Sequence, residues 1–271
     1  CIALYGSGEV DAVAITNMDI LKPSLSRKAV AILPTSTSYG ADALLVSKKI
    51  KKIKDLKSVQ VRGLGQSVSE YMFARNLELA GRNPSKFQFK SMDPGAAALA
   101  MQQKQKGIDA IAVWNPFVID TLEKRQDVRV LFDSTKIPGE IIDLVAMAEE
   151  SLKQEGGEAF ATALADAYYR VNQDLANPAT KDDTLKAIGE KFSNLPVEKM
   201  RKVVEHTRFY GTAQAGIALF EGGPVLTGVS EKKLTELMPL VVKFSKDYGI
   251  LDKPVDVAFG KKPGANLQFD A

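Results

Sequence analysis

The chain is poor in the residues that most often carry chemistry, because among 271 residues it has one cysteine, one histidine and one tryptophan. A single cysteine, Cys1, excludes an internal disulfide and any zinc site built from several thiolates. The single histidine, His206, excludes multi-imidazole sites and leaves a Ser-His-Asp mechanism one candidate base. No run of 18 apolar residues is present, so we predict no membrane-spanning helix. This scarcity is what a protein that catalyses no reaction would show, and we expect no catalytic residue, no metal site and no cofactor.

The charge is nearly balanced, with 36 Lys and Arg against 33 Asp and Glu and a net charge of +3. The densest basic run, KKIKKIKDLK at 48–57, lacks the interleaved aromatic residues of a nucleic-acid surface. We interpret it as a solvated turn and expect no nucleic-acid partner. A content of 45% hydrophobic and 25% charged residues is typical of a globular protein.

A segment near the start of the chain recurs 98 residues later. EVDAVAITNMDI at 9–20 aligns with GIDAIAVWNPFV at 107–118, and the same residue type, Asn17 and Asn115, stands at each exit. Each copy is a continuous apolar run ending in a polar loop, which is typical of a parallel strand covered on both faces. One interpretation is a duplicated lobe, and the other is that any two buried strands look alike.

The second copy lies in a pattern that predicts an open, mostly parallel sheet. Strands expected at 58–63, 86–90 and 108–114 alternate with helices expected at 65–81 and from Asp93 to Gly107. Asp93 and Pro94 are typical of a helix start. By the same plan, the first copy should be preceded by about 50 residues upstream of Cys1, so we expect that the sequence lacks the N-terminal part of the first lobe.

The remaining segments suggest that the chain builds a second lobe and then returns to the first. A strand at 27–35, a polar connection at 35–42 and extended segments at 43–49 and 141–148 are followed by helices at 158–176, 180–192, 196–207 and 230–248. We predict an α/β chain of two three-layer αβα lobes. Residues 1–40 form the first part of lobe one, 41–145 lobe two, and 146–271 the return with the C-terminal helices.

Ligands of such sheets bind outside the carboxyl ends of the strands, which predicts a cleft between the lobes. There, GQSVS at 65–69 offers free backbone N–H groups and hydroxyls to an anionic or strongly polar group, or Ser67 simply caps the helix. Trp114 is either a packing residue or a flat wall against a ligand. We expect three carboxylates near the predicted cleft to be solvated at the surface: Asp19, Asp42 and Glu140.

Nucleotide-binding and catalytic-serine motifs around residues 63–69 are excluded by the spacing of the residues. A dinucleotide fingerprint needs a small residue where Val68 stands, no lysine follows in the Walker position, and no G-x-S-x-G surrounds Ser67. We expect His206, late in the helix at 196–207, to be a capping or surface residue. The segment 210–229 is expected to be a loop near the cleft mouth.

The order of these segments resembles the nitrate/sulfonate/taurine-type periplasmic binding proteins of ABC importers, with the thiamine-precursor-binding proteins as close relatives. The similarity is carried by GEVDAVAIT, GADALLVSKK, IKDLKSVQVRGLGQSVSEYMFARNLELAGRNPSKFQF and GIDAIAVWNPF and covers most of 6–150. It implies the two-lobe type II (Venus flytrap) fold. In relatives the helix start at 65–69 binds an anionic group, and the exit at Trp114–Pro116 contributes to the pocket wall.

The resemblance implies a solute-binding protein that captures a small polar or anionic molecule and delivers it to an inner-membrane permease, as a monomer in the periplasm. Lipid anchoring through Cys1 stays open. The candidate ligand-binding residues are Asn17, Asp19, Ser36, Thr37, Gln66, Ser67, Ser69, Trp114, Asn115 and Glu140. The alternatives are an enzyme on the same fold, of menaquinone-pathway dehydratase or pyrimidine-synthesising type, and a regulatory ligand-binding domain.

Overall fold

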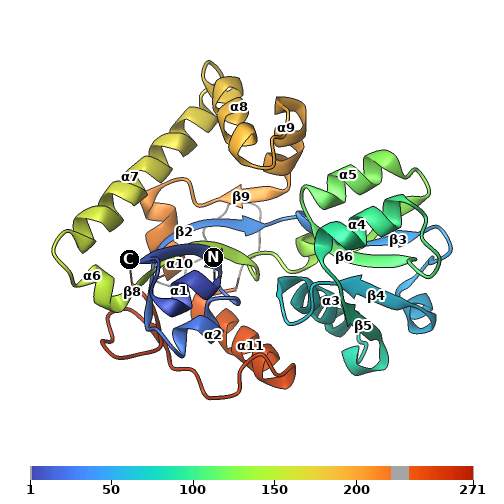
Figure 1. Cartoon of the computed structure of the whole chain (residues 1–271), viewed down its shortest axis with the longest axis horizontal. Coiled ribbons are helices and arrows are strands. Elements are labelled where there is room, and N and C mark those ends of the chain that lie inside the picture. Colours follow the sequence, from blue (N-terminus) through green and yellow to red (C-terminus); the bar gives the residue numbers. More distant parts are fainter. Residues whose placement is uncertain (1, 221–231, 271) are drawn as a thin grey trace. The chain divides into compact units, whose positions relative to one another are not determined.

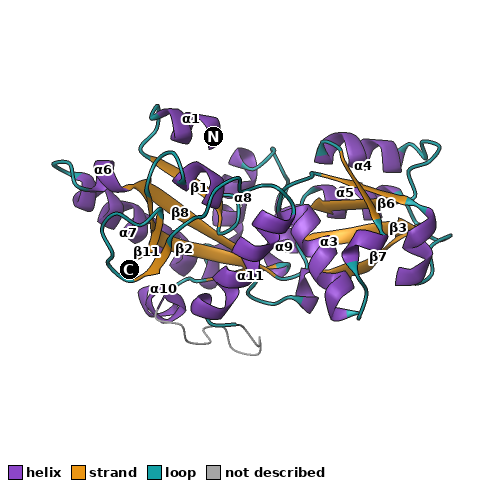
Figure 2. Ribbon diagram, turned by 90° about the horizontal axis from the view of Figure 1, so that it is seen from below, coloured by secondary structure: helices purple, strands orange, loops and turns teal. Residues whose placement is uncertain are grey.

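The computed structural model describes residues 2–220 and 232–270. These form two compact units. Unit 1 comprises Cys1–Thr37, Gly139–Arg201 and Arg208–Ala271, and unit 2 comprises Ser38–Pro138 and Lys202–Thr207. Figure 1 shows the order of the elements by colour, and Figure 2 distinguishes strands from helices. Within the described residues, no helix combines the length and apolarity needed to cross a bilayer.

Unit 2 contains a five-stranded sheet in the order β5-β4-β6-β3-β7. Its strands are β3 (Asp42–Ser47), β4 (Gln60–Gly63), β5 (Gln88–Ser91), β6 (Ala110–Trp114) and β7 (Val128–Asp133). Strand β4 pairs in parallel with β5 and β6, whereas β3 is antiparallel to β6 and β7. The predicted mostly parallel sheet is therefore confirmed, with β3 as the reversed strand.

Local sequence explains where the helices of unit 2 begin. They are α3 (Val68–Leu79), α4 (Pro94–Gln102) and α5 (Phe117–Lys124), with short 3-10 turns at Ile53–Ser58, Pro84–Lys86 and Ser134–Lys136. The Asp93 side chain accepts a hydrogen bond from the backbone N–H of Ala96, and Pro94 occupies the first turn, where no N–H partner is needed. The predicted start of α4 is therefore confirmed.

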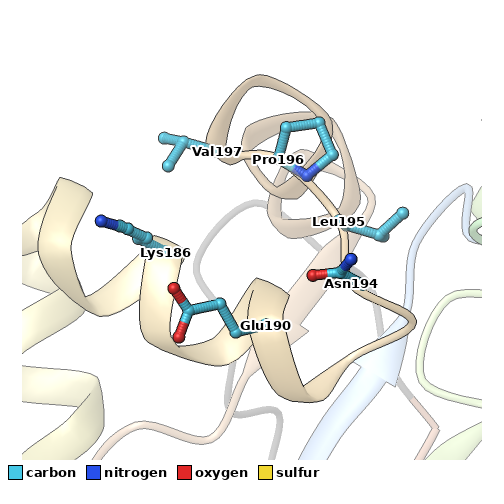
Figure 3. A pocket seen from close by; sticks show the side chains of 6 residues that line it. All are labelled: Lys186, Glu190, Asn194, Leu195, Pro196 and Val197. Atoms are coloured by element: carbon cyan, nitrogen blue, oxygen red, sulfur yellow. The ribbon is translucent and has the colours of Figure 1, made fainter.

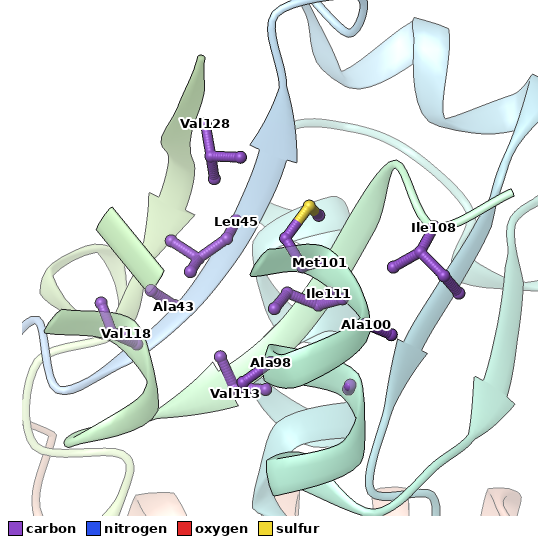
Figure 4. Packing of buried hydrophobic residues seen from close by; sticks show 11 residues of the cluster. Ala43, Leu45, Ala98, Ala100, Met101, Ile108, Ile111, Val113, Val118 and Val128 are labelled. Carbon is purple, nitrogen blue, oxygen red and sulfur yellow. The ribbon is translucent and has the colours of Figure 1, made fainter. Parts of the chain in front are cut away.

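The strand residues of unit 2 alternate between two helical layers. Leu45, Ile111 and Val113 pack against Met101 of α4 and Val118 of α5, in a cluster shown in Figure 4. On α3, the ring of Phe73 lies 5.4 Å from that of Phe89 in β5 and 6.3 Å from that of Phe132 in β7. Helices thus cover both faces, which is the three-layer arrangement.

Unit 1 contains a six-stranded sheet in the order β1-β8-β2-β11-β10, with β9 also paired to β2. Its strands are β1 (Ala12–Thr16), β2 (Ala29–Ser38, of which Ser38 falls in unit 2), β8 (Ile142–Ala148), β9 (Thr207–Phe209, of which Thr207 falls in unit 2), β10 (Val257–Phe259) and β11 (Leu267–Phe269). Its helices are α1 (Ile2–Ser7), α2 (Leu21–Ser24), α6 (Glu149–Leu152), α7 (Gly157–Ala176), α8 (Lys181–Lys191), α9 (Val197–Glu205, of which 202–205 fall in unit 2), α10 (Ala213–Phe220) and α11 (Leu234–Asp247). Strand β8 is antiparallel to both β1 and β2, so the centre of this sheet is antiparallel.

Three sequence predictions about unit 1 are wrong. Residues 35–38 are not a polar connection, because they extend β2 and pair with β8 at Ser36–Asp143 and Thr37–Ile142. Strand β1 is neither parallel nor covered on both faces: among the described residues it pairs only with β8, and Ala14 is exposed. Part of the segment 210–229, which we expected to be a loop, is helix α10. Residues 221–229 of that segment lie outside the described residues, as do residues 230 and 231 of the predicted last helix.

Candidate functional site

The predicted ligand-binding residues divide evenly between the two units. Unit 1 contains Asn17, Asp19, Ser36, Thr37 and Glu140, and unit 2 contains Gln66, Ser67, Ser69, Trp114 and Asn115. Within each unit they lie at one edge of the sheet, where strands β1, β2, β4 and β6 end. That edge is where polar groups at strand exits converge in α/β sheets.

Two of the unit 1 candidates hold the backbone where β8 begins. The Asn17 amide nitrogen donates to the carbonyl oxygen of Glu140 at 3.3 Å, and its oxygen accepts from the N–H of Ile142 at 3.2 Å. The Thr37 hydroxyl donates to the carbonyl oxygen of Ile141 at 2.7 Å. Both ends of the Asn17 amide and the Thr37 hydroxyl therefore have partners within the fold.

Next to them lies a pair of carboxylates, Asp19 and Asp143. The Ser36 hydroxyl donates to Asp143 Oδ2 at 2.8 Å, and the Thr16 hydroxyl accepts from the N–H of Asp19 at 3.0 Å. Burial raises the pKa of Asp143 to about 6; the Ser36 hydrogen bond opposes this increase and the charge of Asp19 adds to it. Burial also raises the pKa of Asp19, against a hydrogen bond from Thr16. Such a pair favours a hydrogen-bond donor or a cation nearby.

Asp143 was missed by the sequence reasoning, although the repeat holds a signal for it. In the first copy Thr16 pairs with Asp143, and at the equivalent position of the second copy Trp114 pairs with Asp42. Both aspartates stand at the start of the antiparallel strand that runs beside the repeated strand. Extending the comparison from 9–20 and 107–118 to 141–148 and 41–47 would have aligned them.

In unit 2, Ser67 caps α3, so the capping interpretation of the 65–69 stretch is confirmed. Its hydroxyl oxygen accepts from the N–H of Ser69 at 3.2 Å and donates to the carbonyl oxygen of Leu64 at 2.7 Å. Gln66 has a left-handed backbone with φ of 56°, and its N–H donates to the Glu70 carboxylate at 2.7 Å. Burial raises the pKa of Glu70, and the bond from Gln66 opposes that increase. Much of the helix start is thus bound within the fold, and the anion cradle stays a prediction.

Three side-chain polar atoms of unit 2 are buried without a hydrogen-bond partner among the described residues: Arg62 Nε on strand β4, and Ser69 Oγ and Asn115 Oδ1 beyond the strand ends. Ser69 is 1% exposed in the first turn of α3, and Asn115 is 4% exposed directly after β6. A buried polar atom without a partner costs roughly 1–3 kcal/mol. Such a cost is what a bound ligand removes. Beside Asn115, Trp114 is half-buried, with its ring 6.1 Å from that of Phe117 in an edge-on arrangement.

His206 and two of the carboxylates differ from expectation. His206 directly follows the last residue of α9, as expected, but it is half-buried and has contacts beyond its helix: its Nδ1 lies 3.2 Å from the Asn115 amide nitrogen, and its carbonyl oxygen accepts from the N–H of Tyr39 at 2.9 Å. Glu140 and Asp42 are 3% and 8% exposed, so simple solvation is wrong for both. These burials arise from packing of segments far apart in the sequence.

A pocket in unit 1 contains none of the predicted residues. It lies between α8 and the start of α9 and is lined by Lys186, Glu190, Asn194, Leu195, Pro196 and Val197 (Figure 3). Across the described part of the chain, no group of three or more His, Cys, Asp or Glu side chains is arranged to hold a metal ion.

Two units, each with a sheet flanked by helices, define a chain of the periplasmic-binding-protein fold. Among solved structures, the aliphatic sulphonate binding protein SsuA from Escherichia coli is similar, with a TM-score of 0.70 and 20% identity over 93% of this chain and 79% of that one. The alkanesulfonate-binding protein SsuA from Xanthomonas axonopodis pv. citri, bound to MOPS, has a TM-score of 0.70 and 14% identity over 93% and 80%.

The ligand-binding component of an ABC-type import system from Staphylococcus aureus has a TM-score of 0.62 and 11% identity over 93% of this chain and 79% of that one. No family model matches the sequence. No curated protein matches it either.

Proposed function

We propose that the protein is the solute-binding component of an ABC-type importer, which captures a small polar or anionic molecule outside the cytoplasmic membrane and delivers it to a permease. In this proposal the protein binds and releases the solute, and no reaction is required. The ligand is nitrate-, sulfonate- or taurine-like, or a thiamine-pyrimidine precursor. The similar proteins named above support the role, since two bind sulfonates and one serves an import system.

The observation that carries the proposal is that two of the three buried side-chain atoms without partners in unit 2, Ser69 Oγ and Asn115 Oδ1, follow strand ends. They lie after the adjacent parallel strands β4 and β6, at the sheet edge where ligands of this architecture bind. In unit 1 the carboxylates of Asp19 and Asp143 lie at the corresponding strand ends. A solute with both acceptor and donor groups matches this set better than a simple anion does.

The test is a thermal-melting screen of the full chain with sulfonates, nitrate, bicarbonate, small amines and pyrimidines. At 100 times its dissociation constant a ligand stabilises the folded protein by about 2.7 kcal/mol, which for a chain of this size raises the melting midpoint by about 5 °C. Ser69→Ala should weaken binding of the compound that gives the shift by about 3- to 10-fold. Ser85→Ala, at an exposed serine of the same unit, should not change it. No shift with any compound would refute the proposed function.

A further inference from the structure

The equivalent asparagines of the repeat, Asn17 and Asn115, are bonded differently. Both follow the repeated strand, and each donates its backbone N–H to the chain where the neighbouring antiparallel strand begins: Asn17 to Ile142 at 2.8 Å, and Asn115 to Ala41 at 3.0 Å. The Asn17 side chain uses both its nitrogen and its oxygen on the backbone of β8 and the residues before it. The Asn115 amide contacts His206 on one side and has no partner for its oxygen among the described residues.

His206 is itself held in place by the fold. Its carbonyl oxygen accepts from the N–H of Tyr39, and its ring lies against Gly40, where an added Cβ would be 3.4 Å from the imidazole. The ring is therefore a fixed partner for the Asn115 amide. A neutral imidazole with its proton on Nε2 accepts at Nδ1, so it holds the amide NH2 and directs the amide oxygen away from itself.

We propose that His206 is a positioning residue that fixes the Asn115 amide so that its oxygen accepts a hydrogen bond from the ligand. This inference rests on the proposed function and narrows it: the solute carries an N–H or O–H donor in addition to any anionic group. Asn115 Oδ1 is closed off from solvent, so the donor reaches it only after neighbouring side chains move. Ligand binding then includes a conformational step.

The first test needs no ligand, because the chain contains one histidine and its imidazole gives a single set of NMR signals. In the ¹⁵N-labelled full chain at pH 8.5 we expect the Nε2–H tautomer with a bare Nδ1. Asn115→Asp should switch the ring to the Nδ1–H tautomer, because a carboxylate only accepts. An Nδ1–H tautomer in the unaltered protein, or no switch in the variant, would overturn the proposal.

The second test compares taurine, which has an ammonium donor, with ethanesulfonate, which lacks it. We expect His206→Leu to weaken taurine binding by about 3- to 10-fold while leaving ethanesulfonate binding unchanged. His206→Gln, which supplies another hydrogen-bond acceptor, should bind taurine about as tightly as the unaltered protein does. Equal losses for both compounds would indicate a merely structural role and overturn the proposal. If no compound of the full screen binds the unaltered protein, the proposed function fails and the ligand contact fails with it. In that case the NMR measurement of the His206 tautomer still tests the orientation of the Asn115 amide.

Discussion

The ionisation of Asp143 makes the stability of the protein depend on pH in a direction that the structure fixes. Its pKa is raised from 3.8 to about 6 in the folded protein, chiefly by burial and also by the charge of Asp19. Since the folded protein binds this proton more tightly than the unfolded chain does, the free energy of unfolding falls as the pH rises from about 4 to above 6. The pKa difference corresponds to at most about 3 kcal/mol.

Asp143→Asn removes this ionisation and keeps an oxygen that accepts from the Ser36 hydroxyl. We expect the variant to be about 1–3 kcal/mol more stable than the original protein at pH 7.5, which raises the melting midpoint by about 2–5 °C, and equally stable at pH 4. Thermal melting followed by circular dichroism between pH 4 and 8 measures the difference. Asp174→Asn, at an exposed carboxylate of α7, serves as the matched control.

The pH dependence of the difference decides the outcome. A constant difference between pH 4 and 8 would show that Asp143 does not titrate in this range. A variant that is less stable than the original at pH 7.5 would show that the carboxylate is stabilised rather than penalised by its surroundings. Either result would refute the account of Asp143, Asp19 and Ser36 given above.

Two further changes test the packing and the carboxylate pair. Gly63→Ala should lower the free energy of unfolding in urea by about 1–3 kcal/mol, because its Cβ would lie 2.6 Å from the carbonyl oxygen of Ala112. The control Gly6→Ala in helix α1, where an added Cβ would have no atom within 4 Å, should be neutral or stabilising. Equal effects of the two changes would contradict the packing argument. Ser36→Ala removes the hydrogen bond that lowers the pKa of Asp143, so the fall in stability with pH should move to higher pH, and an unchanged profile would count against that bond.

The sequence alone determined the elements whose signals are local. Apolar runs and helical spacing predicted β4, α3, β5, α4 and β6 in unit 2, because burial of alternate or every third to fourth residue leaves a periodic pattern. The helix caps at Ser67 and Asp93 could also be predicted from the sequence, since each side chain accepts a hydrogen bond from a backbone N–H two or three residues away.

Only the tertiary structure decided the polar contacts that matter for the candidate site. Ser36 meets Asp143 across 107 residues and Asn115 meets His206 across 91, and no local pattern encodes either pair. The extension of β2 through Thr37 likewise depends on pairing with β8, since hydroxyl residues fit a strand or a loop until a partner strand satisfies their backbone groups. Burial of Glu140 and Asp42 likewise follows from segments that meet only in the folded chain.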